Sequence, residues 1–244
     1  TFAENAHEFR LTPWSDDPVG ASSGEALYLR DEESGHYWSP TPLPCPDHAG
    51  YSTRHGFGYS VFEHTAGGIH SELTVYVDLN DAVKFSVLKV RNDSSLRRRL
   101  SATGYVEWVL GDSRAKTAMH VVTAIDRGSG VLFARNDYNT EFAGRVSFFD
   151  VDDMARTLTG DRGEFLGRNG SLSRPAALKR TRLSGRLCAA LDPCAAIQVP
   201  FELAEGQTRE IIFRLGAGRS VEEARELAQR LRKPGSAQSA LARV

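Results

Sequence analysis

The sequence lacks any apolar run long enough to cross a membrane, and it lacks an excess of charge of either sign. Among its 244 residues, 30 are Lys or Arg and 31 are Asp or Glu, so the formal net charge is −1. A membrane-spanning helix needs roughly 20 apolar residues in a row. A near-neutral chain also has no general electrostatic attraction to nucleic acid or anionic lipid. We therefore expect no nucleic-acid partner and no direct membrane contact.

Cysteine is scarce, and histidine is not arranged for metal binding. The three cysteines, Cys45, Cys188 and Cys194, form an odd set without CxxC spacing, which argues against a disulfide framework and a zinc ribbon. Five histidines lie between His36 and His70, but none are paired at the spacings that bring ligands together on a strand or a helix. We expect no metal, no cofactor and a reducing, cytoplasmic compartment.

Motifs of common enzyme classes are absent as well. The chain has no Walker P-loop, GxSxG elbow, HExxH motif or complete dinucleotide fingerprint. His70 and Glu72 do share one face of an expected strand, and a His with a carboxylate could shuttle a proton to open a sugar ring, as in an aldose 1-epimerase. Ordinary outward polar alternation produces the same spacing, so both interpretations stay open.

What the sequence does contain is a series of strand patterns. Residues 69–78 alternate strictly between apolar and polar side chains. The next run, residues 83–90, changes phase after Val87, which predicts a bulge or a crossing between layers. A third run covers residues 100–110, and Asn/Asp/Ser turns separate all three. We therefore expect the three strands to pair with one another as antiparallel neighbours.

Further strand candidates continue along most of the chain, with no long helical pattern between them. They are residues 25–30, 57–63, 119–125, 130–134, 144–149, 195–203 and 209–215. Many strands separated by turns indicate an all-β fold, a large antiparallel two-sheet sandwich over residues 1–216.

Only the C-terminal part of the chain has a helical pattern. Ser220 begins a capping box, and apolar residues from Val221 to Leu231 then recur on one helical face. The pattern predicts an amphipathic helix within residues 217–233. Pro234 and Gly235 end it, so residues 234–244 are expected to be a flexible tail or the start of a linker.

One segment combines charge and glycine. Residues 159–171 contain two arginines, two carboxylates and four glycines, with no core-forming period. We interpret this segment as a loop that presents charge. Arg162 and Arg168 offer forked donors that suit carboxylates, phosphates or vicinal sugar hydroxyls. A solvated hairpin loop without a ligand is the alternative.

Two proline-rich turns each carry a tryptophan, Trp14 and Trp38. Proline excludes both from a helix interior or a central strand. Either these indoles cover sheet edges, or they form a platform on which the C–H faces of sugar rings stack.

Five segments in order resemble one protein family. They are residues 4–13, 24–32, 38–42, 136–144 and 159–171. The chain is similar to the N-terminal β-sandwich of the cellobiose and chitobiose phosphorylases, and it most resembles the phosphorylase-like region of cyclic β-1,2-glucan synthases. The resemblance extends from Glu4 to about Arg232.

This resemblance implies a galactose-mutarotase-like supersandwich, a linker helix at residues 217–233 and a following (α/α)6 catalytic barrel. In such enzymes inorganic phosphate is a co-substrate that attacks a β-glucoside with inversion, and a barrel aspartate is the general acid. The chain begins with Thr1 rather than Met, so we expect it to be part of a longer polypeptide, whose anchoring in the inner membrane is one option. By itself, the chain is expected to be inactive.

The resemblance also assigns residues. Arg162 is expected to donate to sugar hydroxyls and Arg168 to support the loop or the phosphate side. Trp14, Trp38 and Tyr138 are weaker candidates for the rim of a site that binds a β-glucan or glucooligosaccharide. Family sandwiches also take part in homodimer contacts, so a partner subunit is another occupant for these motifs. A stand-alone glucan-binding module and an aldose 1-epimerase remain as alternatives.

Overall fold

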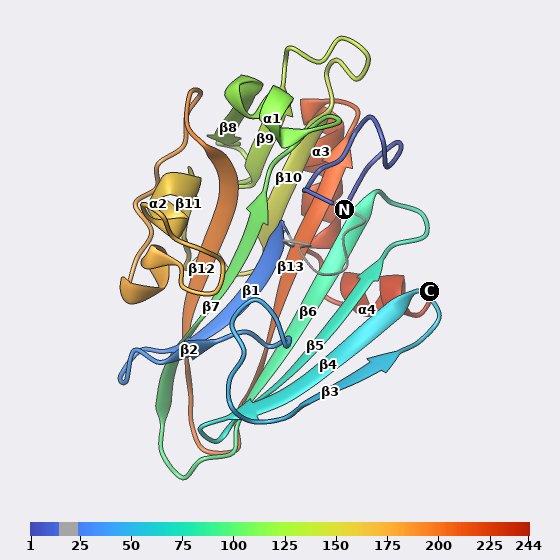
Figure 1. The fold of residues 1–244 in the computed structure, drawn as a ribbon. Helices are drawn as coiled ribbons and strands as arrows, with labels where there is room; N and C mark the ends of the chain where they lie inside the picture. Colours follow the sequence, from blue (N-terminus) through green and yellow to red (C-terminus); the bar gives the residue numbers. More distant parts are fainter. Residues whose placement is uncertain (15–23) are drawn as a thin grey trace.

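Two antiparallel sheets stack face to face in the computed structural model, which describes residues 1–14 and 24–244 (Figure 1). This confirms the expected sandwich. Within the described residues, the five-stranded sheet has the order β11 (Thr157–Asp161), β12 (Pro193–Leu203), β7 (Arg98–Glu107), β1 (Glu25–Asp31) and β2 (Tyr37–Trp38). The eight-stranded sheet has the order β3 (Tyr51–His55), β4 (Tyr59–Ala66), β5 (Ile69–Val77), β6 (Val83–Asn92), β13 (Thr208–Gly218), β10 (Val146–Val151), β9 (Leu132–Asn136) and β8 (Val121–Ile125).

The main core fills the space between the sheets. Leu29 and Val106 of the smaller sheet pack there with Leu73, Leu88 and Phe213 of the larger sheet. These residues occupy alternate positions along their strands, because successive side chains of a strand point to opposite faces. The alternation read from the sequence therefore identified the inward-facing side of β5 correctly.

The phase change in β6 has a different cause from the one expected. The register of β6 with β5 and β13 runs without interruption, so there is no bulge. Val83, Phe85 and Val87 face a second core on the outer side of the sheet, whereas Leu88 and Val90 face the main core. The strand is buried on both faces, which gives a continuous apolar run instead of alternation.

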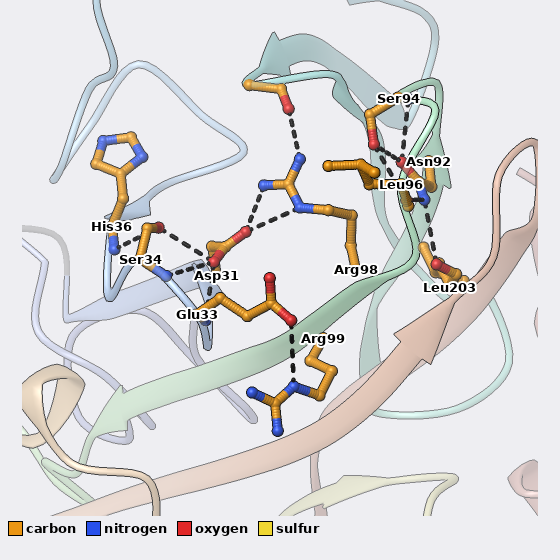
Figure 2. Close-up of polar contacts among 11 residues, drawn as sticks. Asp31, Glu33, Ser34, His36, Asn92, Ser94, Leu96, Arg98, Arg99 and Leu203 are labelled. Atoms are coloured by element: carbon orange, nitrogen blue, oxygen red, sulfur yellow. Dashed lines mark hydrogen bonds and ion pairs between the residues drawn. The ribbon is translucent and has the colours of Figure 1, made fainter.

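The expected pairing of the three long strands is only half correct. β5 and β6 are antiparallel neighbours, but β7 lies in the other sheet, between β12 and β1. The connection from β6 to β7 crosses between the layers. The Asn92 side chain directs this crossing, since its Nδ2 donates to the carbonyls of Leu96 (2.7 Å) and Leu203 (3.1 Å) (Figure 2).

Arg98 ties the two sheets together at the same end of the sandwich. Its Nε donates to Asp31 Oδ2 at 3.0 Å, and its Nη1 donates to the Gly67 carbonyl in the β4–β5 turn at 2.8 Å (Figure 2). Burial alone would raise the pKa of Asp31, but hydrogen bonds from Ser34, Arg98 and Glu33 outweigh it and lower the pKa to about 2.

Four short or medium helices complete the described chain. They are α1 (Arg114–Thr117), α2 (Arg162–Leu166), α3 (Val221–Leu231) and α4 (Ser236–Leu241), with 3-10 turns at Ala118–His120 and Ala176–Lys179. The predicted C-terminal helix is confirmed as α3, and the Ser220 hydroxyl accepts from the Glu223 N–H as its cap. Leu227 and Leu231 of α3 pack on the outer face of the eight-stranded sheet.

The expectation of a flexible tail at residues 234–244 is wrong for most of that segment. Residues 236–241 form α4, and Ala237 and Ala240 are buried in the outer core. The Tyr76 hydroxyl on β5 donates to the Ala237 carbonyl at 2.6 Å. An Ala/Ser segment has too little apolar character to indicate this packing, which depends on a sheet face far away in the sequence.

Removal of residues 234–244 is predicted to lower the melting temperature by about 5–10 °C. The loss exposes the outer core and the Tyr76 hydroxyl, at a cost of about 2–3 kcal/mol, and each kcal/mol shifts the midpoint of a domain this size by about 2–4 °C. Thermal denaturation followed by circular dichroism measures the shift. An unchanged midpoint would show that α4 contributes nothing and behaves as a tail.

Stability is predicted to fall as the pH decreases from about 4 to about 2. The pKa of Asp31 is about 2 in the folded state against an ordinary value of 3.8. Its carboxylate therefore stabilises the fold above pH 4 and loses this effect as it is protonated, a contribution of about 1–2 kcal/mol after allowance for solvent screening. Urea denaturation of the wild type and Asp31→Asn across this range tests the prediction. The difference in the free energy of unfolding between wild type and variant should decrease toward pH 2. A difference that stays constant with pH would contradict the prediction.

Candidate functional site

Residues 159–171 are not an open loop. The first part is the end of β11, and residues 162–166 form α2. Phe165 and Leu166 of this helix are buried because they pack against the outer face of the five-stranded sheet. There Phe165 stacks on Tyr105 with ring centroids 4.5 Å apart. The helix is only five residues long, so no helical period could show in the sequence. The expectation of an exposed loop without core residues is therefore corrected.

Both carboxylates of this segment serve its own structure. Asp161 caps α2, because its Oδ1 accepts from the N–H groups of Gly163 (2.9 Å) and Glu164 (3.3 Å). Glu164 accepts from the Thr159 hydroxyl at 2.7 Å and from the Ser184 N–H at 2.9 Å. The segment thus presents less charge than its composition suggested.

The glycines at its C-terminal side are required by the turn after α2. Gly167 has φ +84°, a backbone conformation that favours glycine. A Cβ on Gly170 would lie 1.8 Å from the Leu166 carbonyl oxygen. These positions are occupied by glycine because the chain folds back on itself, whether or not a ligand approaches.

Arg162 belongs to a closed ring of four charged side chains. Its Nε donates to Glu107 Oε2 at 2.7 Å, and its Nη1 donates to Asp192 Oδ2 at 3.2 Å. Arg114 of α1 closes the ring, with its Nε 2.8 Å from Glu107 Oε1 and its Nη2 bonded to Asp192. The Tyr105 hydroxyl also donates to Glu107 Oε2 at 3.1 Å. The ring joins the ends of β7 and β12 to both short helices.

The ring fixes the charge and direction of Arg162. Burial alone would lower the pKa of Arg162, but its hydrogen bond to Glu107 and the charges of Glu107 and Asp192 raise it, so the guanidinium stays protonated. The side chain is 34% exposed. No described residue accepts from its Nη2, whose N–H groups are available to a hydroxyl or an anion.

Arg162 lies at one side of a cavity of about 760 Å³ between the sheets. Side chains of β1, β4, β5 and β6 form the inner walls, and the loops 41–44 and 170–173 contribute at the outside. Inward-facing Leu27, Phe62, Val75 and Ser86 are only half buried here. The sheets therefore separate at the end of the sandwich opposite the Arg98 contacts.

Of the five residues expected to bind substrate, Arg162 alone lines this cavity. Arg168 is exposed on the turn that follows α2. Trp14 is 54% exposed and lies beneath the Arg10 guanidinium, 5.5 Å from the ring centroid. Tyr138 is 73% exposed and stacks on His120 at 4.1 Å. Neither aromatic side chain contacts the ring of charges.

Trp38 is a correction to the sequence-based interpretation. It is 1% exposed and belongs to the main core. It lies in β2, the edge strand of the smaller sheet, where it pairs with Leu29. Both faces of its indole are covered by protein, so it cannot provide a platform for a sugar ring in this structure.

The His70 and Glu72 pair does not form a site. His70 Nδ1 lies 3.0 Å from the Thr65 hydroxyl, and Glu72 pairs with Lys89 at 3.5 Å. Both project from the outer face of β5, since the cavity is lined by Leu73 and Val75 on the other face. The arrangement matches ordinary polar alternation on a sheet surface.

The described residues contain no cluster of three or more His, Cys, Asp or Glu side chains suited to a metal ion. No helix in the part of the chain that the structure describes is both long and apolar enough to span a bilayer.

Two unequal antiparallel sheets with helices on the outer face of the larger one define a large β-supersandwich domain. The chain belongs to the glycosyl hydrolase 94 family: residues 1–234 match the family model described as the supersandwich domain of glycosyl hydrolase 94. This match confirms the resemblance inferred from the five sequence segments.

Two relatives illustrate the family. The chain is 35% identical over 234 residues to cyclic beta-(1,2)-glucan synthase NdvB of Rhizobium meliloti (strain 1021), covering 95% of this chain and 8% of that protein. It is 28% identical over 227 residues to N,N'-diacetylchitobiose phosphorylase of Vibrio proteolyticus, covering 88% of this chain and 28% of the relative. The chain therefore spans less than a third of the length of either relative.

Among solved structures, a bacterial glucoamylase complexed with acarbose is similar in fold. The TM-score is 0.55 with 10% sequence identity, and the match covers 85% of this chain and 28% of that chain. A likeness at this level of identity concerns the arrangement of the sheets alone.

Glu107→Gln is predicted to destabilise the domain by about 2–3 kcal/mol. The substitution leaves Arg162 and Arg114 facing a neutral amide in a half-buried ring, and a broken buried charge pair is costly. Urea denaturation measures the change. Asp112→Asn is the matched control, because Asp112 pairs with Lys116 in an exposed ion pair that contributes about 0–0.5 kcal/mol. Equal effects of the two substitutions would contradict a structural role for the ring.

Proposed function

We propose that this chain is the non-catalytic, carbohydrate-associated sandwich domain of a larger β-glucan phosphorylase or cyclic β-1,2-glucan synthase. The observation that carries this proposal is its 35% identity to a cyclic beta-(1,2)-glucan synthase over 95% of the chain. Five ordered sequence segments and the supersandwich fold support it. In this proposal an (α/α)6 barrel, joined through α3 and α4, supplies the general acid and most of the phosphate site.

The domain's own contribution is to shape the sugar site through Arg162. Glu107 and Asp192 hold two nitrogens of its guanidinium and leave Nη2 available. A side chain fixed in this way loses little conformational entropy when it donates to a sugar hydroxyl. Arg168, exposed two residues after α2, is proposed to support the loop or the phosphate side.

Trp14 and Tyr138 are proposed as rim contacts, either with a glucooligosaccharide or with a second subunit. Both are exposed and each already packs on one cationic or aromatic neighbour, which limits its rotamers. The parent is proposed to act in the cytoplasm, with the inner membrane as a possible anchor outside this chain. Inorganic phosphate is its proposed co-substrate.

The first test is whether phosphorolysis requires the downstream segment. The 244-residue chain and its extended reading frame are each incubated with inorganic phosphate and β-linked glucobioses, and released glucose 1-phosphate is measured. We expect activity only from the extended polypeptide, because the general acid and most of the phosphate site are proposed to lie in the downstream barrel. Activity of the isolated chain, or the absence of a helical-repeat segment downstream, would refute the proposal.

In the parent, Arg162→Lys is predicted to reduce kcat/KM for a glucobiose at least tenfold. Lysine keeps the charge but cannot bond Glu107 and Asp192 while donating to a hydroxyl. Arg127→Lys is the control, since Arg127 is an exposed arginine in the β8–β9 turn. Steady-state kinetics and melting temperatures of both variants are compared. If Arg162→Lys behaves like the control, Arg162 does not serve the sugar site.

A further inference from the structure

The cavity between the sheets exists because one strand edge is left without a partner. β1 pairs with β7 along its whole length, but β2 pairs only with Leu29 and Arg30. The next residue of β2 in register with Leu27 would be Pro40, which has no N–H to donate. The chain leaves the sheet at this point, and the N-terminal half of β1 becomes an edge of the cavity.

The main-chain groups of Leu27 point into this opening. Glu107 N donates to the Gly24 carbonyl and Asp31 N donates to the His36 carbonyl, so odd-numbered residues of β1 direct their polar groups away from β7. No residue in the described ranges 1–14 and 24–244 bonds to the N–H or carbonyl of Leu27. A free donor and a free acceptor therefore stand side by side on the cavity wall.

The charged residues of the cavity are already neutralised in pairs. Lys84 Nζ lies 2.7 Å from Glu25 Oε2, and Arg162 Nε lies 2.7 Å from Glu107 Oε2. Burial alone would raise the pKa of Glu25, but the charge and hydrogen bond of Lys84 and the hydrogen bond of Thr1 lower it. Paired charges of this kind give the cavity no net attraction for an ion, so a neutral ligand is favoured.

The remaining walls combine apolar surface with hydroxyl groups. Leu27, Phe62 and Val75 offer half-buried apolar surface, and hydroxyls surround it. The hydroxyl-bearing residues are Thr41, Ser60, Ser86, Tyr105, Ser171 and Ser173. Ser86 has no hydrogen-bond partner among the residues that the structure describes. Apolar surface for C–H faces beside scattered hydroxyl partners is the chemistry that a sugar ring requires.

We infer that this cavity is a binding site for a short, neutral glucan chain, with Arg162 at one side of it. Its volume of about 760 Å³ lies within the range of about 300–1,000 Å³ of small-molecule sites. Apolar C–H faces pack on Leu27 and Phe62, and ring hydroxyls bond to Ser86 and to the main chain of Leu27. The choice of a glucan as ligand rests on the proposed function.

An added peptide strand fits this edge less well. Strand addition needs a row of free main-chain groups at every second residue. Here Leu29 is already paired with Trp38, so the row of free main-chain groups does not continue past Leu27 along the rest of β1. One residue provides two hydrogen bonds, enough for a sugar but not for a strand.

Titration of the 244-residue chain with a β-1,2-linked glucotriose tests the inference, using calorimetry and amide NMR spectra. We expect roughly millimolar binding and a shift of the Leu27 amide signal. Ser86→Leu puts a bulkier apolar side chain in place of the hydroxyl on the cavity wall and should raise the Kd at least tenfold. Ser86→Ala only removes the hydroxyl and should raise the Kd severalfold. This variant keeps the test valid if the larger leucine side chain disturbs folding. Ser52→Leu on the exposed strand β3 is the control and should leave the Kd unchanged.

Three results would overturn the inference: no binding at 20 mM sugar, equal Kd values for Ser86→Leu and Ser52→Leu, or shifts that do not include Leu27. None of these affects the Arg162 kinetics of the parent, so the proposed function is tested separately. Conversely, sugar binding in the cavity together with an Arg162→Lys parent of normal activity would keep the cavity site and remove the proposed role of Arg162.

Discussion

A sheet of five strands cannot cover a sheet of eight, and this mismatch determines most of the architecture. The two inner faces meet where β7 and β12 pack over β6, β13 and β10, and the main core lies there. Beyond β1 the smaller sheet has only the two-residue strand β2 to offer. The larger sheet continues through β5, β4 and β3 without an opposing strand, and the cavity lies above that region.

The outer face of the larger sheet is covered by helices instead of a second sheet. Without them, apolar residues of β6, β10 and β13 would be exposed. α3 and α4 cover them (Figure 1). Arg232, at the end of α3, donates to the fully buried Asp150 of β10 at 2.6 Å and 2.5 Å, and Arg156 bonds the same carboxylate at 3.0 Å. A buried carboxylate is tolerated only when it is paired and hydrogen-bonded, as it is here. The charge therefore fixes where the helix docks.

Sequence patterns were sufficient for the elements that have one wet and one dry face. They predicted β5 and α3 because alternation or helical period survives when only one side is buried. They failed for β3, where every residue after Tyr51 is exposed. They predicted β6 as a strand, but its burial on both faces was misread as a bulge or a crossing between layers. They also failed for α2, whose five residues are shorter than two helical turns. The crossing from β6 to β7 could not be predicted, since the Asn92 side chain acts across 111 positions to reach Leu203.

The candidate site shows a similar division. Arg162 could be singled out from residue chemistry, because a guanidinium among glycines is an unusual combination. Its partners could not, since Glu107 lies 55 positions away and joins it only through the sheet. Of the two interpretations left open for Trp38, the structure matches the one in which the indole covers a sheet edge. Proline-rich surroundings indicate a turn, but they do not reveal whether the aromatic side chain folds inward.

The order of α4 has a mechanical consequence. Its N-terminal side is held by the Tyr76 hydroxyl, and its alanines lie in the outer core, so the last residues of the chain are positioned by the sheet. A flexible tail would fix only how far an attached unit can travel. A docked helix also fixes the direction in which the attached unit points. A fluorophore or protein fused at Val244 would therefore rotate little relative to the sandwich and would report its orientation.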